Sequence, residues 1–244
     1  MNAELFESML AERAARRSFA IVTRLRDGAQ ALVTEDAVRG DLSLDDAHVD
    51  ETRRRVLADR SGTLESADEP LFVRCHARPP RLVVVGAVHI TQALAPMAAM
   101  AGFEVHVIDP RRAFATAERL PGVSVSTEWP EQAIARIGID ARTAVVTLSH
   151  DPKLDDPALI AALRSRAFYI GALGSTRTHA KRVARLTDAG LGDSIGRIHA
   201  PVGLDLGGRA PVEIAVAIVA QLIRARYAKA ATEPAVEAGS ARAA

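Results

Sequence analysis

The chain has 244 residues, of which 48% are hydrophobic, so it is long and apolar enough to build a substantial core. Lys and Arg number 31 against 30 Asp and Glu, and the resulting net charge of +1 gives no general basic field for holding a nucleic-acid backbone. Aromatic residues make up only 4% of the chain, which also argues against a surface for stacking bases. We therefore expect a folded protein that binds no nucleic acid.

Cys75 is the only cysteine, which excludes an internal disulfide and a four-thiolate metal centre within one chain. Its strand context predicts a buried, unreactive thiol, and no other pattern indicates a metal site or a catalytic residue. The N-terminus carries acids where a secretion signal needs positive charge, and no apolar run is long enough to span a membrane. The sequence therefore predicts a cytoplasmic protein without a membrane partner.

Residues 1–78 are predicted to form a small α+β domain. The expected elements are an amphipathic helix that includes residues 5–10, strands over 19–25 and 31–34 on either side of the turn pair Asp27-Gly28, a charged helix over 45–59, and a strand over 71–75. The double proline Pro79-Pro80 then forms a stiff connector to the second part of the chain.

From residue 79 to residue 228, apolar strands alternate with helices. Strands are expected over 82–85, 103–108, 123–125, 143–148 and 168–170, and helices over 91–101, 131–137, 156–164, 175–189 and 211–227. This alternation predicts an α/β fold with a doubly wound parallel sheet. Residues 229–244, rich in Ala, Glu and Gly, are predicted to be a disordered tail.

Ligands bind at the carboxyl ends of the strands in such sheets, so the turns after the strands are the candidate sites. The first turn is Gly86-Ala87-Val88-His89, and Asp109 follows Gly86 by 23 residues, close to the separation at which dinucleotide-binding units keep a ribose-binding acid. Val88 stands where the glycine fingerprint needs a residue without a Cβ. The turn therefore fits either a phosphate cradle or a packed turn, and His89 fits either a ligand contact or an ordinary helix start.

Later turns collect further polar residues: Ser149, His150 and Asp151 after one strand, and Gly171, Gly174, Ser175 and Arg177 after the next. Free backbone N–H groups at a helix start and a nearby arginine suit an anion. The plainer interpretation makes Ser175 a helix N-cap and Asp151 a turn residue. The glycine-rich loop over 198–211, which contains Asp205, is expected to be rigid and to shape the site.

Together these turns resemble the XdhC/CoxI family of molybdenum hydroxylase accessory proteins. The resemblance covers residues 81–227, and its motifs are residues 82–87 with His89, 107–109 with Arg111 and Arg112, 149–151, 169–175, and 199–207 with 213–215. Two features depart from the family pattern. Val88 replaces a glycine, and residues 1–78 lack a counterpart of the motif with glycine and cysteine in the family's longer N-terminal domain.

The resemblance implies a Rossmann-like C-terminal domain and a chaperone rather than an enzyme. Such a protein binds molybdenum cofactor, as molybdopterin or its dinucleotide form, assists its sulfuration, and inserts it into a xanthine dehydrogenase-type molybdenum hydroxylase. The implied partners are that hydroxylase, a cysteine desulfurase and a second copy of the chain. The cofactor-binding set implied by the resemblance places Gly174, Ser175 and Arg177 at the phosphate, His89, His150 and Asp151 near the pterin, Asp205 as a polar wall, and Gly86, Ala87, Asp109 and Gly171 in the surrounding turns.

Two other interpretations stay open. Asp109 and the sheet fit an NAD(P)-dependent oxidoreductase, although Val88 argues against a dinucleotide cradle, and Tyr169 lacks the lysine four residues later that hydride chemistry often uses. A ligand-free paralogue that acts only by docking fits the Val88 change and the missing N-terminal motif.

Overall fold

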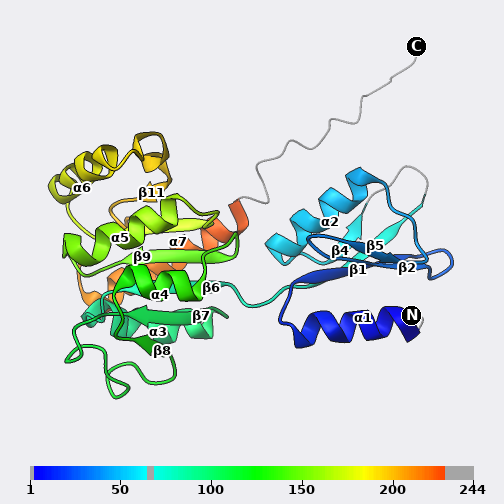
Figure 1. Ribbon diagram of the computed structural model, residues 1–244, viewed down its shortest axis with the longest axis horizontal. Coiled ribbons are helices and arrows are strands. Elements are labelled where there is room, and N and C mark those ends of the chain that lie inside the picture. The colour runs from blue at the N-terminus through cyan, green and yellow to red at the C-terminus, as the bar shows by residue number, and fades with distance from the viewer. Residues whose placement is uncertain (1–2, 65–68, 229–244) are drawn as a thin grey trace, which may run out of the picture. The chain divides into compact units, whose positions relative to one another are not determined.

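The computed structural model describes residues 3–64 and 69–228, so the tail predicted over 229–244 lies outside the described residues. Two compact units divide the chain after Arg78, and the second runs from Pro79 to Arg226. Figure 1 shows each unit with its own sheet. In the part of the chain that the structure describes, no helix has the length and apolar character needed to cross a bilayer.

The N-terminal unit is an antiparallel sheet of five strands in the order β3-β2-β1-β5-β4, with one helix on each face (Figure 1). Its elements are α1 (Ala3–Ala14), β1 (Phe19–Arg24), β2 (Gln30–Val33), β3 (Val38–Gly40), α2 (Asp46–Ala58), β4 (Gly62–Leu64) and β5 (Leu71–His76). Successive side chains of β1 alternate between the faces: Phe19 and Ile21 pack with Leu5 of α1, whereas Ala20 and Val22 join the cluster beneath α2. Cys75 is buried, as predicted.

The C-terminal unit is a parallel sheet of six strands in the order β11-β10-β9-β6-β7-β8. Its elements are β6 (Arg81–Val85), α3 (His89–Met100), β7 (Glu104–Ile108), β8 (Ser124–Ser126), α4 (Pro130–Ile137), β9 (Thr143–Thr147), α5 (Pro152–Leu163), β10 (Tyr169–Ala172), α6 (Thr176–Asp188), a short 3-10 helix (Gly192–Arg197), β11 (Ile198–His199) and α7 (Pro211–Ala228). The order is that of a Rossmann sheet, in which the chain starts at the centre and turns back to build the second half. The predicted fold class is therefore confirmed.

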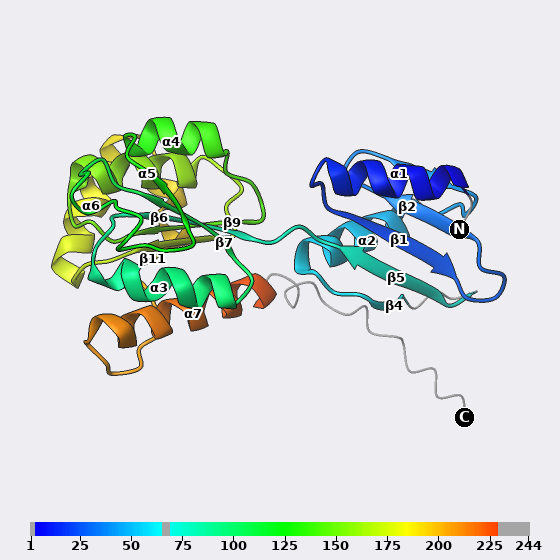
Figure 2. The ribbon, with the colours of Figure 1, turned by 90° about the horizontal axis from the view of Figure 1, so that it is seen from below.

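Helices cover both faces of this parallel sheet. Leu82 and Val84 of β6 face the cluster that α3 and α7 complete, whereas Val83 and Val85 face the cluster formed with α4, α5 and α6. Figure 2 shows α3 and α7 together on one side and α4 and α5 on the other. Burial on both faces explains why the strand reads as an unbroken apolar run.

The structure departs from the predicted elements at several places. α5 begins at Pro152 rather than at residue 156, because Asp151 caps the helix and proline is tolerated in its first turn. α3 begins at His89 and continues through Pro96. Three short strands, β3, β4 and β11, occupy segments that carry no predicted strand.

Candidate functional site

The turn after β6 and the loop after β9 meet at the centre of the sheet. β6 and β9 are adjacent parallel strands, so the loops that follow them emerge at the same edge, where the strand order reverses. Gly86 has a positive φ of +108°, and a Cβ built on it would lie 2.8 Å from the backbone nitrogen of Ser149. Glycine is therefore required at this position because the two loops touch.

Asp109, at the end of β7, lies beneath the first turn. Its side chain is 0% exposed and accepts hydrogen bonds from the Ala87 amide at 2.8 Å and from Nη2 of Arg111 at 2.7 Å. Burial raises the pKa of this carboxyl, but the bonds from Arg111 and Ala87 outweigh that effect and hold the pKa below its ordinary value. The carboxylate thus fastens the turn, and its oxygens are already engaged where a ribose would need them.

Val88 and His89 open α3. Val88 is the N-cap residue, with an ordinary φ of −89°, and it packs against the hydrophobic cluster beneath α3. This position therefore needs neither left-handed backbone nor glycine. His89, the first residue of the helix, is exposed.

The loop after β9 is held by hydrogen bonds that its side chains make with the first turn of α5. Asp151 caps α5 by accepting from the Lys153 amide at 2.9 Å, and Ser149 donates its hydroxyl to Asp155 Oδ1 at 2.6 Å. His150, between them, has a left-handed φ of 62° and is exposed. A left-handed non-glycine residue carries a conformational cost and is held in place by the structure on both sides.

The turn before α6 separates the predicted residues into different roles. Ser175 is the N-cap of α6 and accepts from the Thr178 amide at 3.3 Å. Gly174 has a φ of +139°, and a Cβ there would lie 3.0 Å from Thr178. Gly171 is buried inside β10, where a Cβ would lie 2.6 Å from the side chain of Val202, so its role is packing.

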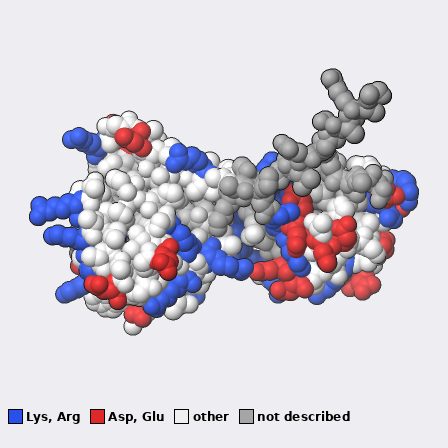
Figure 3. Space-filling view, turned by 90° about the horizontal axis from the view of Figure 1, so that it is seen from above, with Lys and Arg blue, Asp and Glu red and all other residues white. Residues whose placement is uncertain are grey.

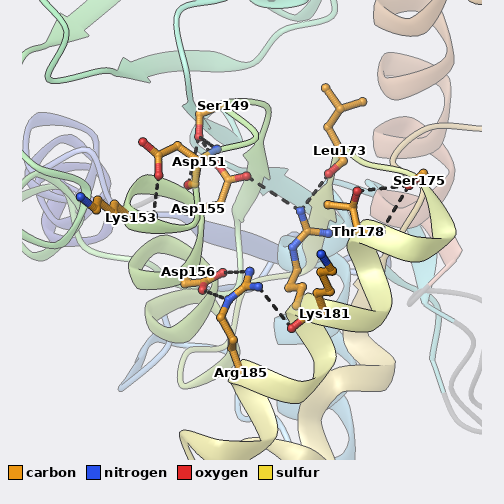
Figure 4. A network of polar contacts seen from close by, with 11 residues as sticks. Ser149, Asp151, Lys153, Asp155, Asp156, Leu173, Ser175, Thr178, Lys181 and Arg185 are labelled. Carbon is orange, nitrogen blue, oxygen red and sulfur yellow. Dashed lines mark hydrogen bonds and ion pairs between the residues drawn. The ribbon is translucent and has the colours of Figure 1, made fainter.

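A cavity of about 250 Å³ lies between α5 and α6 at this edge of the sheet. It is lined by His150, Pro152, Asp155, Arg177, Thr178, Lys181, Arg182 and Arg185. Figure 4 shows the network around it, with Asp155 and Asp156 on the α5 side and Lys181 and Arg185 on the α6 side. The cavity brings together two of the predicted residues, His150 and Arg177, whereas His89 and Asp205 are not among its lining residues.

The most deeply placed residues of the cavity were not predicted from the sequence. Arg182 is 2% exposed, its Nη2 donates to the Leu173 carbonyl at 2.8 Å, and the same nitrogen lies 3.9 Å from Asp155 Oδ2. Burial lowers the pKa of Arg182, and burial raises the pKa of Asp155 although Ser149 and Arg182 oppose that shift. A sequence pattern does indicate the other basic residues of the cavity. Arg177, Lys181 and Arg185 recur every four residues and so share one face of α6.

Asp205, the last of the predicted site residues, lies in the loop before α7. It is exposed and accepts from the Gly207 amide at 3.3 Å. Among residues 3–64 and 69–228, no three His, Cys, Asp or Glu side chains are grouped in a way that could hold a metal ion.

Comparison with known proteins identifies a family for the C-terminal unit. The sequence profile of the XdhC Rossmann domain matches residues 82–222. The chain is 33% identical over 157 residues to a probable xanthine dehydrogenase subunit of Bacillus subtilis, covering 64% of this chain and 46% of that protein. It is 33% identical over 147 residues to the molybdenum cofactor insertion chaperone PaoD of Escherichia coli, covering 60% of this chain and 40% of that protein. The chain spans less than half the length of the curated relatives it matches.

A solved structure shares the fold over most of the chain. The crystal structure of a protein from Bacillus halodurans, described as a xanthine dehydrogenase, aligns with a TM-score of 0.69 at 22% identity. The alignment covers 94% of this chain and 69% of that one. At this identity the likeness shows the fold alone.

Proposed function

The chain belongs to the XdhC Rossmann-domain family, and from this we propose that it is an accessory protein that binds molybdenum cofactor, assists its sulfuration and inserts it into a xanthine dehydrogenase-type hydroxylase. Two curated relatives support the proposal, because one is named as part of a probable xanthine dehydrogenase and the other as a molybdenum cofactor insertion chaperone. The proposed partners are the hydroxylase, a cysteine desulfurase and a second copy of the chain.

The observation that carries the proposal is the basic cavity at the carboxyl edge of the sheet. The cargo is a pterin with a terminal phosphate, and a phosphate bears about two negative charges at neutral pH. Arg177 and His150 line one cavity, and its lining also includes Pro152 from the first turn of α5 and Thr178 from the first turn of α6. Helix N-termini and arginine are the groups that proteins use for phosphate, so the residues present fit this end of the cargo.

We assign the remaining predicted residues to roles around the phosphate in this cavity. Gly174 and Ser175 shape the first turn of α6 beside Arg177, and they present its backbone N–H groups to the phosphate. His150, with His89 at the start of α3 and Asp151 at the start of α5, addresses the pterin edge, and Asp205 forms an outer wall. Gly86, Ala87, Asp109 and Gly171 act indirectly, by fixing the backbone of the turns.

The test is purification of the chain from cells that make the cofactor, followed by oxidation and measurement of pterin fluorescence per mole of protein. We expect substantial occupancy in the wild-type chain. A chain that carries no pterin and takes up none when mixed with a cofactor source contradicts the proposal, and it leaves the docking paralogue as the better description.

The nicotinamide alternative is tested in the same preparation by calorimetry with NAD and NADP. We expect no binding in the micromolar range, because Asp109 is fully buried and paired with Arg111, and because Val88 fills the place of the second glycine. Micromolar NAD binding that accompanies reduction of a substrate would replace the chaperone by an oxidoreductase.

A further inference from the structure

The cavity between α5 and α6 holds more positive charge than the protein itself neutralises. Its lining includes four cationic side chains, Arg177, Lys181, Arg182 and Arg185, and one carboxylate, Asp155. Arg185 is paired with Asp156 through two nitrogens, and Asp155 lies near Arg182, so two cationic charges remain. Within the described residues neither Arg177 nor Lys181 forms an ion pair, and Figure 3 shows Lys and Arg side chains projecting from the end of this unit where Figure 1 places α6.

Arg182 adds an independent observation that points to a ligand. Its side chain is only 2% exposed, yet among the described residues its Nε and Nη1 have no hydrogen-bond partner. Leaving donors of a buried charged group unpaired costs free energy. The single contact with Asp155, at 3.9 Å, is too long for a hydrogen bond and compensates the buried charge poorly.

We propose that this cavity is a phosphate-binding site, with Arg182 at its floor and Lys181 and Arg177 at its mouth. An anion in the cavity gives the unpaired Nε and Nη1 of the buried guanidinium a hydrogen-bond partner, and it neutralises the unpaired charges of Arg177 and Lys181. The phosphate's place as one end of a pterin cargo rests on the proposed function, whereas the anion site itself rests on the cavity and its charges.

The dimensions of the cavity suit a single charged group. Pockets that enclose drug-sized ligands measure about 300–1,000 Å³, and this one measures about 250 Å³. It therefore takes a phosphate or diphosphate group, with the rest of a larger ligand outside. A dianionic phosphate carries about two negative charges at neutral pH, which matches the two cationic charges that the protein leaves unpaired.

Asp155 is the carboxylate of the cavity that lies near the buried guanidinium of Arg182. Its carboxylate accepts from the Ser149 hydroxyl and lies near the buried guanidinium, so a bound phosphate meets repulsion from it. Asp155→Asn removes the negative charge and keeps an oxygen that can accept from Ser149. The substitution therefore separates a ligand site from a purely structural ion pair, because only a ligand site gains anion affinity from it.

The test uses the full chain, purified without phosphate, in calorimetric titrations with inorganic phosphate and inorganic pyrophosphate at constant ionic strength. We expect both anions to bind the wild-type chain, Lys181→Ala to weaken binding about tenfold, and Asp155→Asn to strengthen it about tenfold. Arg136→Ala, which removes an exposed arginine that does not line the cavity, is the matched control and should leave both affinities unchanged.

Arg182→Met tests the floor of the cavity directly and should abolish binding. Because a buried residue is altered, its melting temperature is measured alongside, and Lys181→Ala and Asp155→Asn decide the matter if this variant does not fold. Absence of binding by the wild-type chain overturns the inference. So do equal affinities in the wild type, Lys181→Ala and Asp155→Asn, since the charges would then serve only to join α5 to α6.

Retained pterin is measured on the same preparations, which separates failure of the site from failure of the function. Displacement of pterin by pyrophosphate supports the proposal that the phosphate of the pterin binds in this cavity. Pyrophosphate binding by a chain that never carries pterin supports the site and contradicts the proposed function. Pterin retention that is insensitive to Lys181→Ala, in a chain that binds no pyrophosphate, supports the function and overturns the site.

Discussion

At the scale of single residues, the turns at the centre of the parallel sheet are held in place by Asp109 and Gly86. Asp109 joins the turn after β6 to the turn after β7, because its buried carboxylate accepts from both Ala87 and Arg111. Gly86 lets the turn after β6 approach the loop after β9. In the proposed function these residues act on a ligand only through the backbone that they position.

Asp109→Asn is expected to lower the free energy of unfolding by about 1.5–3 kcal/mol at pH 7, the range for hydrogen bonds to a charged group. The pKa of Asp109 is lowered by folding, so its contribution is fully present above the ordinary carboxyl pKa and is lost as pH falls through the folded value. The difference between wild type and variant should therefore shrink below about pH 4.

Urea unfolding at pH 7 and at pH 3 measures this difference. The control is Asp205→Asn, which removes an exposed carboxylate and should change the free energy of unfolding by less than about 0.5 kcal/mol. A cost for Asp109→Asn that stays constant between the two pH values would show that the carboxylate charge is not what stabilises the turn.

Gly86→Ala is expected to destabilise more than Gly102→Ala does. Both glycines have positive φ, but a Cβ at Gly86 would lie 2.8 Å from the Ser149 nitrogen, whereas one at Gly102 meets nothing within 4 Å. The Gly102 variant should cost about 1–2 kcal/mol for left-handed backbone alone, and the Gly86 variant should exceed it because the loops must also separate. Thermal unfolding of the two variants compares these costs, and equal melting temperatures would contradict the close approach.

At the scale of elements, the first turns of the helices determine which groups at the edge of the sheet can contact an anion. Ser175→Ala removes the N-cap of α6 and should cost about 1 kcal/mol. Ser175→Asp keeps a capping oxygen and should retain stability, yet it places a negative charge beside Arg177 and should weaken pyrophosphate binding. Chemical denaturation and calorimetry on both variants test the pair, and unchanged anion affinity in Ser175→Asp would place the anion away from this turn.

Val88→Gly tests the start of α3. Val88 adopts an ordinary extended conformation and packs on the core, so we expect a loss of about 0.5–1 kcal/mol from backbone freedom together with some lost packing. We expect no gain in phosphate affinity, which calorimetry with pyrophosphate measures. A clear gain would show that this turn, and not the α5–α6 cavity, receives the anion.

The sequence predicts the elements with strong patterns and misses those that depend on tertiary contacts. Continuous apolar runs and helix periodicity locate the longer strands and helices of the parallel sheet. β11 consists of two residues paired with β10, which is too short to produce a pattern. The turns after the strands likewise identify His150 and Arg177, because polar residues that directly follow an apolar strand are easily recognised in the sequence.

The floor of the cavity could not be found in the same way. With α5 predicted to begin at residue 156, Asp155 falls outside the helix, and its approach to Arg182 depends on how two helices pack. Arg182 is a charged residue on the inward face of α6, one turn from Leu186, where the pattern favours an apolar side chain. Nothing in a single sequence distinguishes such a residue from the exposed arginines beside it.

At the scale of the whole molecule, every assigned site residue lies in the C-terminal unit. We expect residues 79–228, expressed alone, to unfold cooperatively and to bind pyrophosphate as tightly as the full chain, because this unit contains both helix-covered faces of its sheet. Circular dichroism during thermal unfolding and calorimetry measure the two properties. A fragment that folds but loses affinity would show that the first 78 residues contribute to the site.

The central claim is that a phosphate-bearing pterin binds in the cavity between α5 and α6, at the edge of the parallel sheet formed by the C-terminal ends of its strands. The most direct measurement is the dissociation constant of molybdenum cofactor for the wild-type chain, for His150→Ala with Arg177→Ala combined, and for Arg136→Ala. We predict that the double variant binds at least about tenfold more weakly, while Arg136→Ala binds as the wild type does. Equal dissociation constants for all three proteins would contradict the account.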